Sequence, residues 1–229
     1  MQSSPDGQEP ARKAFGPGTA FGPYVIVRPL GRGGFAPVFL AEELHEGKKL
    51  RDVALKLFFL PDDIDPTSER AAAWRDGVFA EARALCRVQH PSVVQFLSVI
   101  RDKFSDTFGL AMEYVGGETL DGRLTRLGHL DEQEVLEALA QVAWALSAVH
   151  AAGLVHRDVK PANIVCGALG YKLIDFGVVA DMDPARRAAM ELEAQKFIVG
   201  TPGYIAPECL RGASVADRKS TRLNSSHQI

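Results

Sequence analysis

The sequence predicts an α+β fold, with a β-rich first part followed by a mainly helical second part. The 229 residues are 46% hydrophobic and 24% charged, which is typical of a globular protein with a substantial core. Short runs rich in β-branched and aromatic residues recur up to Val115. A long stretch with helical periodicity dominates the second part.

The composition argues against several classes of protein. Lys and Arg number 26 against 29 Asp and Glu, a net charge of −3, which does not suit a nucleic-acid binder that relies on a basic field. No apolar run approaches the roughly 18 residues of a membrane helix, and we see no signal-peptide pattern. The three cysteines are scattered, without metal-ligand spacing. We expect a cytoplasmic globular chain with no nucleic-acid partner and no membrane segment in this fragment, and a membrane anchor further downstream stays an open alternative.

The first part is predicted to contain five strands and one helix. Residues 1–22 are rich in Gly, Pro, Ser and Gln, which predicts a flexible arm. Apolar residues three and four apart predict a helix over Thr67–Val88, between the third and fourth strands. The five strands are expected at Tyr24–Leu30, Val38–Glu42, Val53–Phe59, Val93–Ile100 and Phe108–Val115.

Capping signals mark a long helix in the second part. Asp131 and Glu134 form a D-x-x-E helix start, a looser relative of the capping box. Gly153 is placed to stop the same helix as its C′ residue. Two short strands are expected after it, at Asn163–Cys166 and Lys172–Ile174.

The last thirteen residues are set apart from the rest. The run Asp217–His227 resembles the translation of a common short-read sequencing adapter, with Gln228 and Ile229 from the index after it. We therefore expect the gene's own sequence in this chain to end near Ala216; the alternative is a polar tail. The basic residues of this tail are therefore not expected to contribute to function.

A glycine cluster lies between the first two predicted strands, in the run Gly31-Arg-Gly33-Gly34-Phe-Ala36-Pro37. Glycines let the backbone approach a polyphosphate and point N–H groups at it. A tight hairpin turn would explain the same glycines.

Lys56 stands inside the apolar third strand. A lysine there needs an anionic partner or must leave the core. A phosphate together with the Glu81 carboxylate, from the neighbouring helix, would supply one, and Glu69 is a weaker rival near the start of that helix. The alternative is a surface lysine on an edge strand.

The run His156-Arg-Asp158-Val-Lys160-Pro-Ala-Asn163 is the most specific pattern. Asp158 can accept a proton from a hydroxyl nucleophile, and Lys160 can neutralise charge on a transferred phosphoryl group. Asn163 supplies an oxygen ligand for Mg²⁺, and Asp175, in Asp175-Phe-Gly, would complete that site. His156 is expected to be a packed, hydrogen-bonded core residue.

These motifs, followed by Gly200-Thr-Pro-Gly-Tyr-Ile-Ala-Pro-Glu208, occur in the order typical of eukaryotic-type (Hanks-type) protein kinases. From about Tyr24 to Ala216 the chain resembles the bacterial Ser/Thr branch of that family. The resemblance implies the bilobal protein-kinase fold, with a five-stranded antiparallel N-lobe with one main helix, and a mainly helical, incomplete C-lobe. The N-lobe and hinge would occupy residues 23–115 and the truncated C-lobe residues 116–216.

The resemblance also implies ATP, Mg²⁺ (or Mn²⁺) and protein substrates. Asp158 would be the catalytic base, and Asn163 and Asp175 the metal ligands. Lys160 and Thr201 match the Ser/Thr branch. Met112 falls at the gatekeeper position. The ATP-binding residues would be Gly31, Gly33 and Gly34 at the phosphates, Lys56 paired with Glu81, Val38 and Ala54 above the adenine, and the Glu113 carbonyl and Val115 N–H at its edge.

Two departures from the family pattern bear on regulation. Ala36 and Pro37 replace the third glycine and its neighbour, which predicts a stiffer loop. No Ser, Thr or Tyr lies between Gly177 and Gly200, where relatives carry a phosphate facing the residue equivalent to Arg157. Glu191 or Glu193 would stand in for that phosphate, or be solvated helix charges. Autophosphorylation by self-association is then expected on the arm, at Ser3, Ser4 or Thr19.

Three functions remain open from the sequence. The first is a Ser/Thr protein kinase, and the second a pseudokinase or inactive truncated binding module. Pseudokinases typically lack at least one motif residue, and all are present here. The third is a small-molecule phosphotransferase of related fold, against which Lys160 and the Gly200–Glu208 segment argue.

Overall fold

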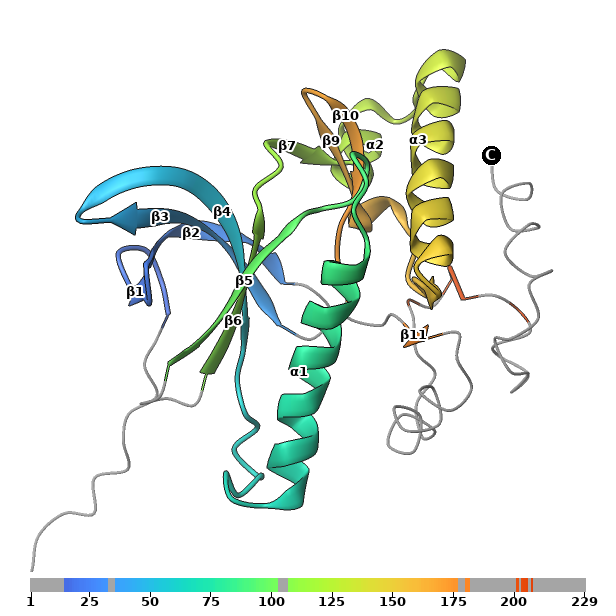
Figure 1. The fold of residues 1–229 in the computed structure, drawn as a ribbon. Helices are drawn as coiled ribbons and strands as arrows, with labels where there is room; N and C mark the ends of the chain where they lie inside the picture. The colour runs from blue at the N-terminus through green and yellow to red at the C-terminus, as the bar shows by residue number, and fades with distance from the viewer. Residues whose placement is uncertain are drawn as a thin grey trace, which may run out of the picture. The chain divides into compact units, whose positions relative to one another are not determined.

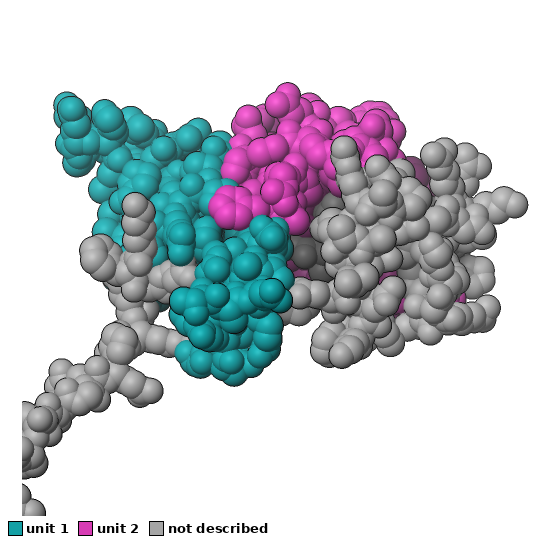
Figure 2. Space-filling view, turned by 60° about the horizontal axis from the view of Figure 1, so that its bottom comes forward, with its two compact units in different colours: residues 1–78, 97–114 teal, residues 79–96, 115–229 magenta. Residues whose placement is uncertain are grey.

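The computed structural model describes residues 15–32, 36–102, 107–176, 180–181, 201, 203–205 and 207. Two compact units emerge from the contacts within the chain (Figure 2): unit 1 holds residues 1–78 and 97–114, and unit 2 holds residues 79–96 and 115–229. Helix α1 (Glu69–Arg87) begins in unit 1 and ends in unit 2. Within the described ranges, none of the helices is both long and apolar enough to cross a membrane.

Unit 1 is built on a six-stranded sheet in the order β1-β2-β3-β4-β6-β5 (Figure 1). The pairs β1–β2, β2–β3, β3–β4 and β4–β6 are antiparallel. Trp74 of α1 packs edge-on against Phe108, with ring centroids 5.8 Å apart. The strands are β1 (Ala20–Phe21), β2 (Tyr24–Arg32), β3 (Pro37–His45), β4 (Lys48–Phe58), β5 (Phe96–Asp102) and β6 (Thr107–Glu113).

One face of this sheet carries the hydrophobic core of unit 1. Side chains alternate between the two faces of a strand, so Val53, Leu55 and Leu57 of β4 all face the core. We call this set of buried residues the unit 1 cluster: Phe21, Tyr24, Ile26, Phe39, Ala41, Val53, Leu55, Leu57 and Ala111. The intervening residues of β4, among them Lys56, belong to the opposite face.

The five predicted strands are confirmed, but the third begins earlier and the fourth later than predicted. β4 starts at Lys48 because a hairpin turn at Glu46 and Gly47, with φ of 51° and 75°, pairs its polar end with β3. Ion pairs hold this polar ladder, with Lys49 Nζ 2.9 Å from Glu42 Oε1. An apolar-run criterion finds no strand in such a segment.

The predicted flexible arm over residues 1–22 is wrong for residues 15–22. These residues form a turn and the sixth strand, β1, and Phe15 packs against the unit 1 cluster. Gly16, Gly18 and Gly22 give the segment the composition of a linker, although Phe15 and Phe21 supply apolar anchors. Residues 1–14, which include Ser3 and Ser4, lie outside the described residues.

The described part of unit 2 combines one long helix, a short helix and small sheets. Helix α3 (Glu132–Ala151) begins as predicted, since the Asp131 side chain accepts a hydrogen bond from the Glu134 N–H at 2.8 Å. It ends as predicted, with Gly153 following at φ 72°. The other elements are β7 (Gly117–Thr119), α2 (Leu120–Leu127), β8 (Leu154–Val155), a 3₁₀ turn η1 (Pro161–Asn163), β9 (Ile164–Gly167), β10 (Gly170–Leu173) and β11 (Ala180–Asp181).

The two faces of α3 differ in burial. Ala138, Val142, Ala145 and Val149 are buried, at the spacing of one helix face. Leu136, Leu139 and Trp144 are exposed, with Trp144 at 62%.

The strand predicted at Val93–Ile100 starts later, at Phe96. Val93 instead forms a parallel bridge to Leu173 of β10. The Leu173 N–H donates to the Ser92 carbonyl at 2.8 Å, and the Val94 N–H donates to the Leu173 carbonyl at 3.0 Å. One apolar run thus serves two different sheets, which the sequence pattern does not separate.

Candidate active site

Asp158 is the centre of a compact polar network in unit 2. Its Oδ1 accepts hydrogen bonds from the Thr201 hydroxyl at 2.7 Å and from the Thr201 N–H at 3.1 Å. Its Oδ2 accepts from Lys160 Nζ at 2.8 Å and from Asn163 Nδ2 at 3.0 Å. Lys160 Nζ also donates to Thr201 Oγ1 at 2.5 Å. Asp158, Lys160 and Asn163, separated by two and three residues, therefore converge with a threonine 43 positions away.

This network keeps the Asp158 carboxylate ionised. Burial by itself raises the pKa of a carboxyl group, because it penalises the charged form. Hydrogen bonds from Lys160, Thr201 and Asn163 outweigh burial and lower the pKa of Asp158 below its ordinary value. An ionised, oriented carboxylate can accept a proton from a bound hydroxyl.

The two predicted metal ligands flank the open end of one hairpin. In the β9–β10 hairpin, Ile164 pairs with Leu173, and the next residues outward are Asn163 and Ile174. The Ile174 N–H donates to the Asn163 carbonyl at 2.9 Å, which brings Asp175, the following residue, to the same end. The register of the hairpin thus brings Asn163 and Asp175 to the same end of β9 and β10.

The oxygen ligands at this end of the hairpin are of the kind that a hard cation prefers. Asn163 Nδ2 donates to the Asp158 carbonyl at 2.8 Å and to Asp158 Oδ2, which turns the amide so that its oxygen is the group left for a metal. Asp175 adds a carboxylate. Among the described residues, no group of three or more His, Cys, Asp or Glu side chains gathers as a metal site. One amide and one carboxylate still suffice for Mg²⁺ that is also held by phosphates and water.

Two residues of the site have a left-handed backbone. Arg157 has φ 67° and Asp175 has φ 64°, and this region costs an ordinary L-residue roughly 1–2 kcal/mol. Such strain persists where the surroundings fix the conformation, and it clusters at functional sites. The sequence gives little signal for it, because Arg has no preference for this region and Asp tolerates it far less than glycine does.

His156 is a packed core residue, as predicted. Its side chain is 1% exposed and its ring lies edge-on to Phe176, with centroids 5.0 Å apart. The Asp158 N–H donates to His156 Nδ1 at 3.4 Å. Burial lowers the pKa of His156 to about 4, despite the nearby carboxylates of Asp175 and Asp158.

The buried His156 predicts an acid-dependent stability. Between pH 6.5 and 4 the unfolded state binds a proton that the folded state rejects, so the free energy of unfolding falls as the pH is lowered. The loss should reach about 3 kcal/mol. Denaturant titrations from pH 7 to 4 check this: the slope should flatten in His156→Asn and persist in His129→Asn, which leaves His156 in place. An unchanged slope in His156→Asn would contradict it.

In unit 1, Lys56 shares a sheet face with the predicted adenine-contacting residues. Directly opposed residues of antiparallel strands lie on the same face. Val38 opposes Lys56, and Ala54 opposes Met112. Lys56 is only 4% exposed, with its Nζ 5.3 Å from the centroid of the Phe58 ring. This face is opposite to the unit 1 cluster.

Of the remaining predicted site residues, some lie in unit 1, some in unit 2 and some outside the described residues. Gly31 pairs with Val38 at the end of β2, and Glu113 ends β6, both in unit 1. Glu81, buried on α1, and Val115 belong to unit 2. Gly33, Gly34, Glu191 and Glu193 lie outside the described residues.

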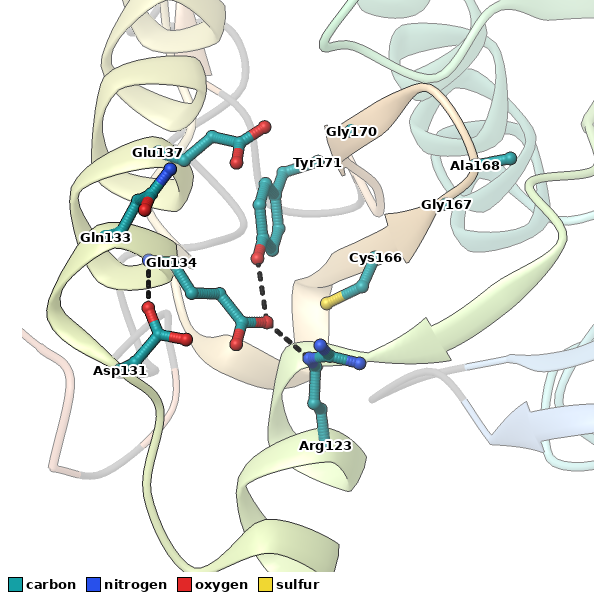
Figure 3. Close-up of a pocket in the computed structure, with 10 residues that line it drawn as sticks. All are labelled: Arg123, Asp131, Gln133, Glu134, Glu137, Cys166, Gly167, Ala168, Gly170 and Tyr171. Carbon is teal, nitrogen blue, oxygen red and sulfur yellow. Dashed lines mark hydrogen bonds and ion pairs between the residues drawn. The ribbon is translucent and has the colours of Figure 1, made fainter.

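A second polar network in unit 2 was not predicted from the sequence. Arg123 of α2 binds Glu134, and Tyr171 donates to Glu134 at 3.0 Å (Figure 3). Arg123 also lies 3.3 Å from Glu118. Arg126 binds Glu118 as well. Burial and the Glu134 carboxylate raise the pKa of Tyr171 to about 12. The network braces α2, α3, β7 and β10 beside an open pocket of about 480 Å³, lined by Arg123, Asp131, Gln133, Glu134, Glu137, Cys166, Gly167, Ala168, Gly170 and Tyr171.

Comparisons with known proteins agree with the motifs. The chain is 35% identical over 201 residues to serine/threonine-protein kinase pkn2 of Myxococcus xanthus, an alignment that covers 86% of the chain and 22% of that protein. It is 36% identical over 205 residues to PknD of Mycobacterium tuberculosis, covering 88% and 28%. It is 32% identical over 200 residues to PrkC of Bacillus subtilis, covering 87% and 28%.

The chain thus spans only about a quarter of the length of these curated relatives. The model of the protein kinase domain matches residues 24–221. That range contains the Asp158 network, the Lys56 face and the β9–β10 hairpin. The chain therefore belongs to the protein kinase domain family.

Proposed function

We propose that the protein is a Ser/Thr protein kinase that transfers the γ-phosphoryl group of ATP to hydroxyl groups of protein substrates. The Asp158 network carries this proposal. In the transfer, the substrate hydroxyl oxygen forms a bond to the γ-phosphorus, the bond to the β-phosphate oxygen breaks, ADP leaves, and Asp158 accepts the hydroxyl proton. Lys160, 2.8 Å from Asp158, neutralises charge on the transferred group.

ATP and Mg²⁺ are the proposed cofactors, with Mn²⁺ as a substitute. Asn163 and Asp175 would hold the metal, which neutralises charge on the phosphate oxygens. Lys56 would hold the α- and β-phosphates and pair with Glu81. The backbone at Gly31, Gly33 and Gly34 would cradle the phosphates. Val38, Ala54, Glu113 and Val115 would bind the adenine.

Specificity for Ser and Thr rests on the contact between Lys160 and Thr201. Their hydrogen bond fixes both beside Asp158, and a small aliphatic hydroxyl would be presented there. The alternative, a pseudokinase or an inactive binding module, is disfavoured because the basic, acidic and amide groups of the transfer site are all present and mutually oriented.

The proposed partners are protein substrates, including a second copy of the same protein during autophosphorylation. Of the acceptor sites expected on the arm, Thr19 is half-buried in a turn, which makes it a poorer acceptor than a residue in an extended segment. We propose that the kinase domain acts in the cytoplasm.

Transfer of label from γ-labelled ATP tests the proposed function. The full-length protein, a mixture of Ser-, Thr- and Tyr-containing peptides and Mg²⁺ should yield phosphoserine and phosphothreonine but no phosphotyrosine. Chelation of the metal should abolish transfer, and Mn²⁺ should restore it. Nucleotide binding without transfer to any peptide or to the protein itself would favour the pseudokinase instead.

A further inference from the structure

The segment from Phe15 to Phe21 is tightly integrated into unit 1. The Phe15 ring lies 5.6 Å, centroid to centroid, from the ring of Phe21 and also from that of Phe59. Phe21 is 1% exposed, and its ring fills the space that a side chain at Gly109 of β6 would need, since an added Cβ would lie 2.6 Å from Phe21 Cε1. Two phenylalanines therefore anchor this segment.

A hydrogen-bonded turn carries Phe15 to its place. The Thr19 N–H donates to the Gly16 carbonyl at 3.0 Å, and the Gly16 N–H donates to Thr19 Oγ1 at 3.2 Å. Two backbone hydrogen bonds join the turn to Ile26 of β2. The Gly18 N–H donates to the Ile26 carbonyl at 2.7 Å, and the Ile26 N–H donates to the Thr19 carbonyl at 3.0 Å.

Phe15 covers the end of the strand that carries Lys56. Val53, Leu55 and Leu57 of β4 belong to the unit 1 cluster, and Phe59, just past the strand, touches Phe15. Lys56 lies between two of these anchors and belongs to the other face. The packing of the odd-numbered residues therefore sets how β4 is rotated, and with it the direction of the Lys56 side chain.

We propose that residues 15–21 are a strap that positions β4, and that Phe15 is a positioning residue for the nucleotide site. This inference rests on the proposed function, in which Lys56 holds the ATP phosphates. Without the Phe15 ring, the end of β4 samples looser arrangements. The apparent nucleotide affinity then falls in proportion to the share of molecules with Lys56 in place.

Kinetic variants of the full-length protein test the strap. Phe15→Ala should raise the KM for ATP on the order of fivefold, with kcat nearly unchanged. Phe15→Leu, which keeps apolar volume, should recover most of the affinity. Ile100→Ala is the matched control, because Ile100 also packs partly buried against the unit 1 cluster but belongs to β5. It should lower the melting temperature without raising KM.

The turn offers an independent pair of variants. Thr19→Val removes the acceptor for the Gly16 N–H and should raise the KM for ATP, as Phe15→Ala does. Thr19→Ser keeps the hydroxyl and should behave as wild type. If Phe15→Ala and Ile100→Ala change KM equally, Phe15 is merely part of the core and the strap is refuted.

Amide hydrogen exchange separates this inference from the proposed function. In Phe15→Ala, the amides of residues 53–58 should exchange faster than in wild type. In Ile100→Ala, the same amides should exchange more slowly than in Phe15→Ala. If the wild type transfers no phosphoryl group, the proposed function fails, and exchange at residues 53–58 still decides about the strap. Unchanged exchange in Phe15→Ala refutes it.

Discussion

Asp158→Asn should lower kcat for phosphoryl transfer by at least about 100-fold, the range by which general-base catalysis accelerates reactions. The amide cannot accept the hydroxyl proton. If its NH₂ group takes the place of Asp158 Oδ2, it faces two hydrogen-bond donors that this oxygen accepted from, Lys160 at 2.8 Å and Asn163 at 3.0 Å. The KM for ATP should change little, because Asp158 is proposed to act on the hydroxyl rather than on the nucleotide.

Thr201→Val is the matched variant for this experiment. It removes the 2.7 Å hydroxyl contact to Asp158 but keeps the carboxylate, so the loss in kcat should be roughly 10-fold, smaller than for Asp158→Asn. Melting temperatures and nucleotide binding of both variants show whether they are folded. A folded, nucleotide-binding Asp158→Asn protein with kcat near wild type would remove Asp158 as the base.

Gly117→Ala should be the most damaging small substitution in unit 2. Gly117 opens β7 at φ 147°, a conformation nearly restricted to glycine. A Cβ there would lie 2.0 Å from the Cys166 carbonyl oxygen and 2.9 Å from its carbon, so the β7–β9 pairing would have to separate. We expect a loss on the order of 3 kcal/mol in the free energy of unfolding, measured by denaturant titration.

Gly77→Ala serves as the control for that substitution. Gly77 lies on the exposed side of α1, and an added Cβ would meet nothing within 4 Å. Alanine should therefore stabilise the protein by roughly 0.5–1 kcal/mol, since it favours the helix. Equal effects of the two substitutions would mean that Gly117 is not constrained as the structure indicates.

Local chemical signals account for what the sequence predicted correctly. Asp131 and Gly153 mark the ends of α3 because a carboxylate cap and a left-handed glycine each satisfy groups that the helix leaves open. The spacing of Asp158, Lys160 and Asn163 reflects one short segment whose side chains must converge, so sequence distance alone is informative there.

Long-range contacts explain what the sequence left unpredicted. Phe15 stands among glycines and a proline, and its segment is held by contacts with Phe21 and Phe59 and by hydrogen bonds to β2. The polar start of β4 is held by ion pairs across a hairpin, which an apolar pattern does not register. The left-handed backbone at Asp175 is not predictable from its residue type, because Asp tolerates this conformation but adopts it far less often than glycine.

The distribution of tryptophans gives each unit an optical reporter of its own. The sequence contains two tryptophans: Trp74, stacked edge-on against Phe108 in unit 1, and Trp144, exposed on α3 in unit 2. A water-exposed indole emits at longer wavelength than one packed against an aromatic ring. With Trp74→Phe and Trp144→Phe, fluorescence can therefore record whether the two units unfold together or in sequence.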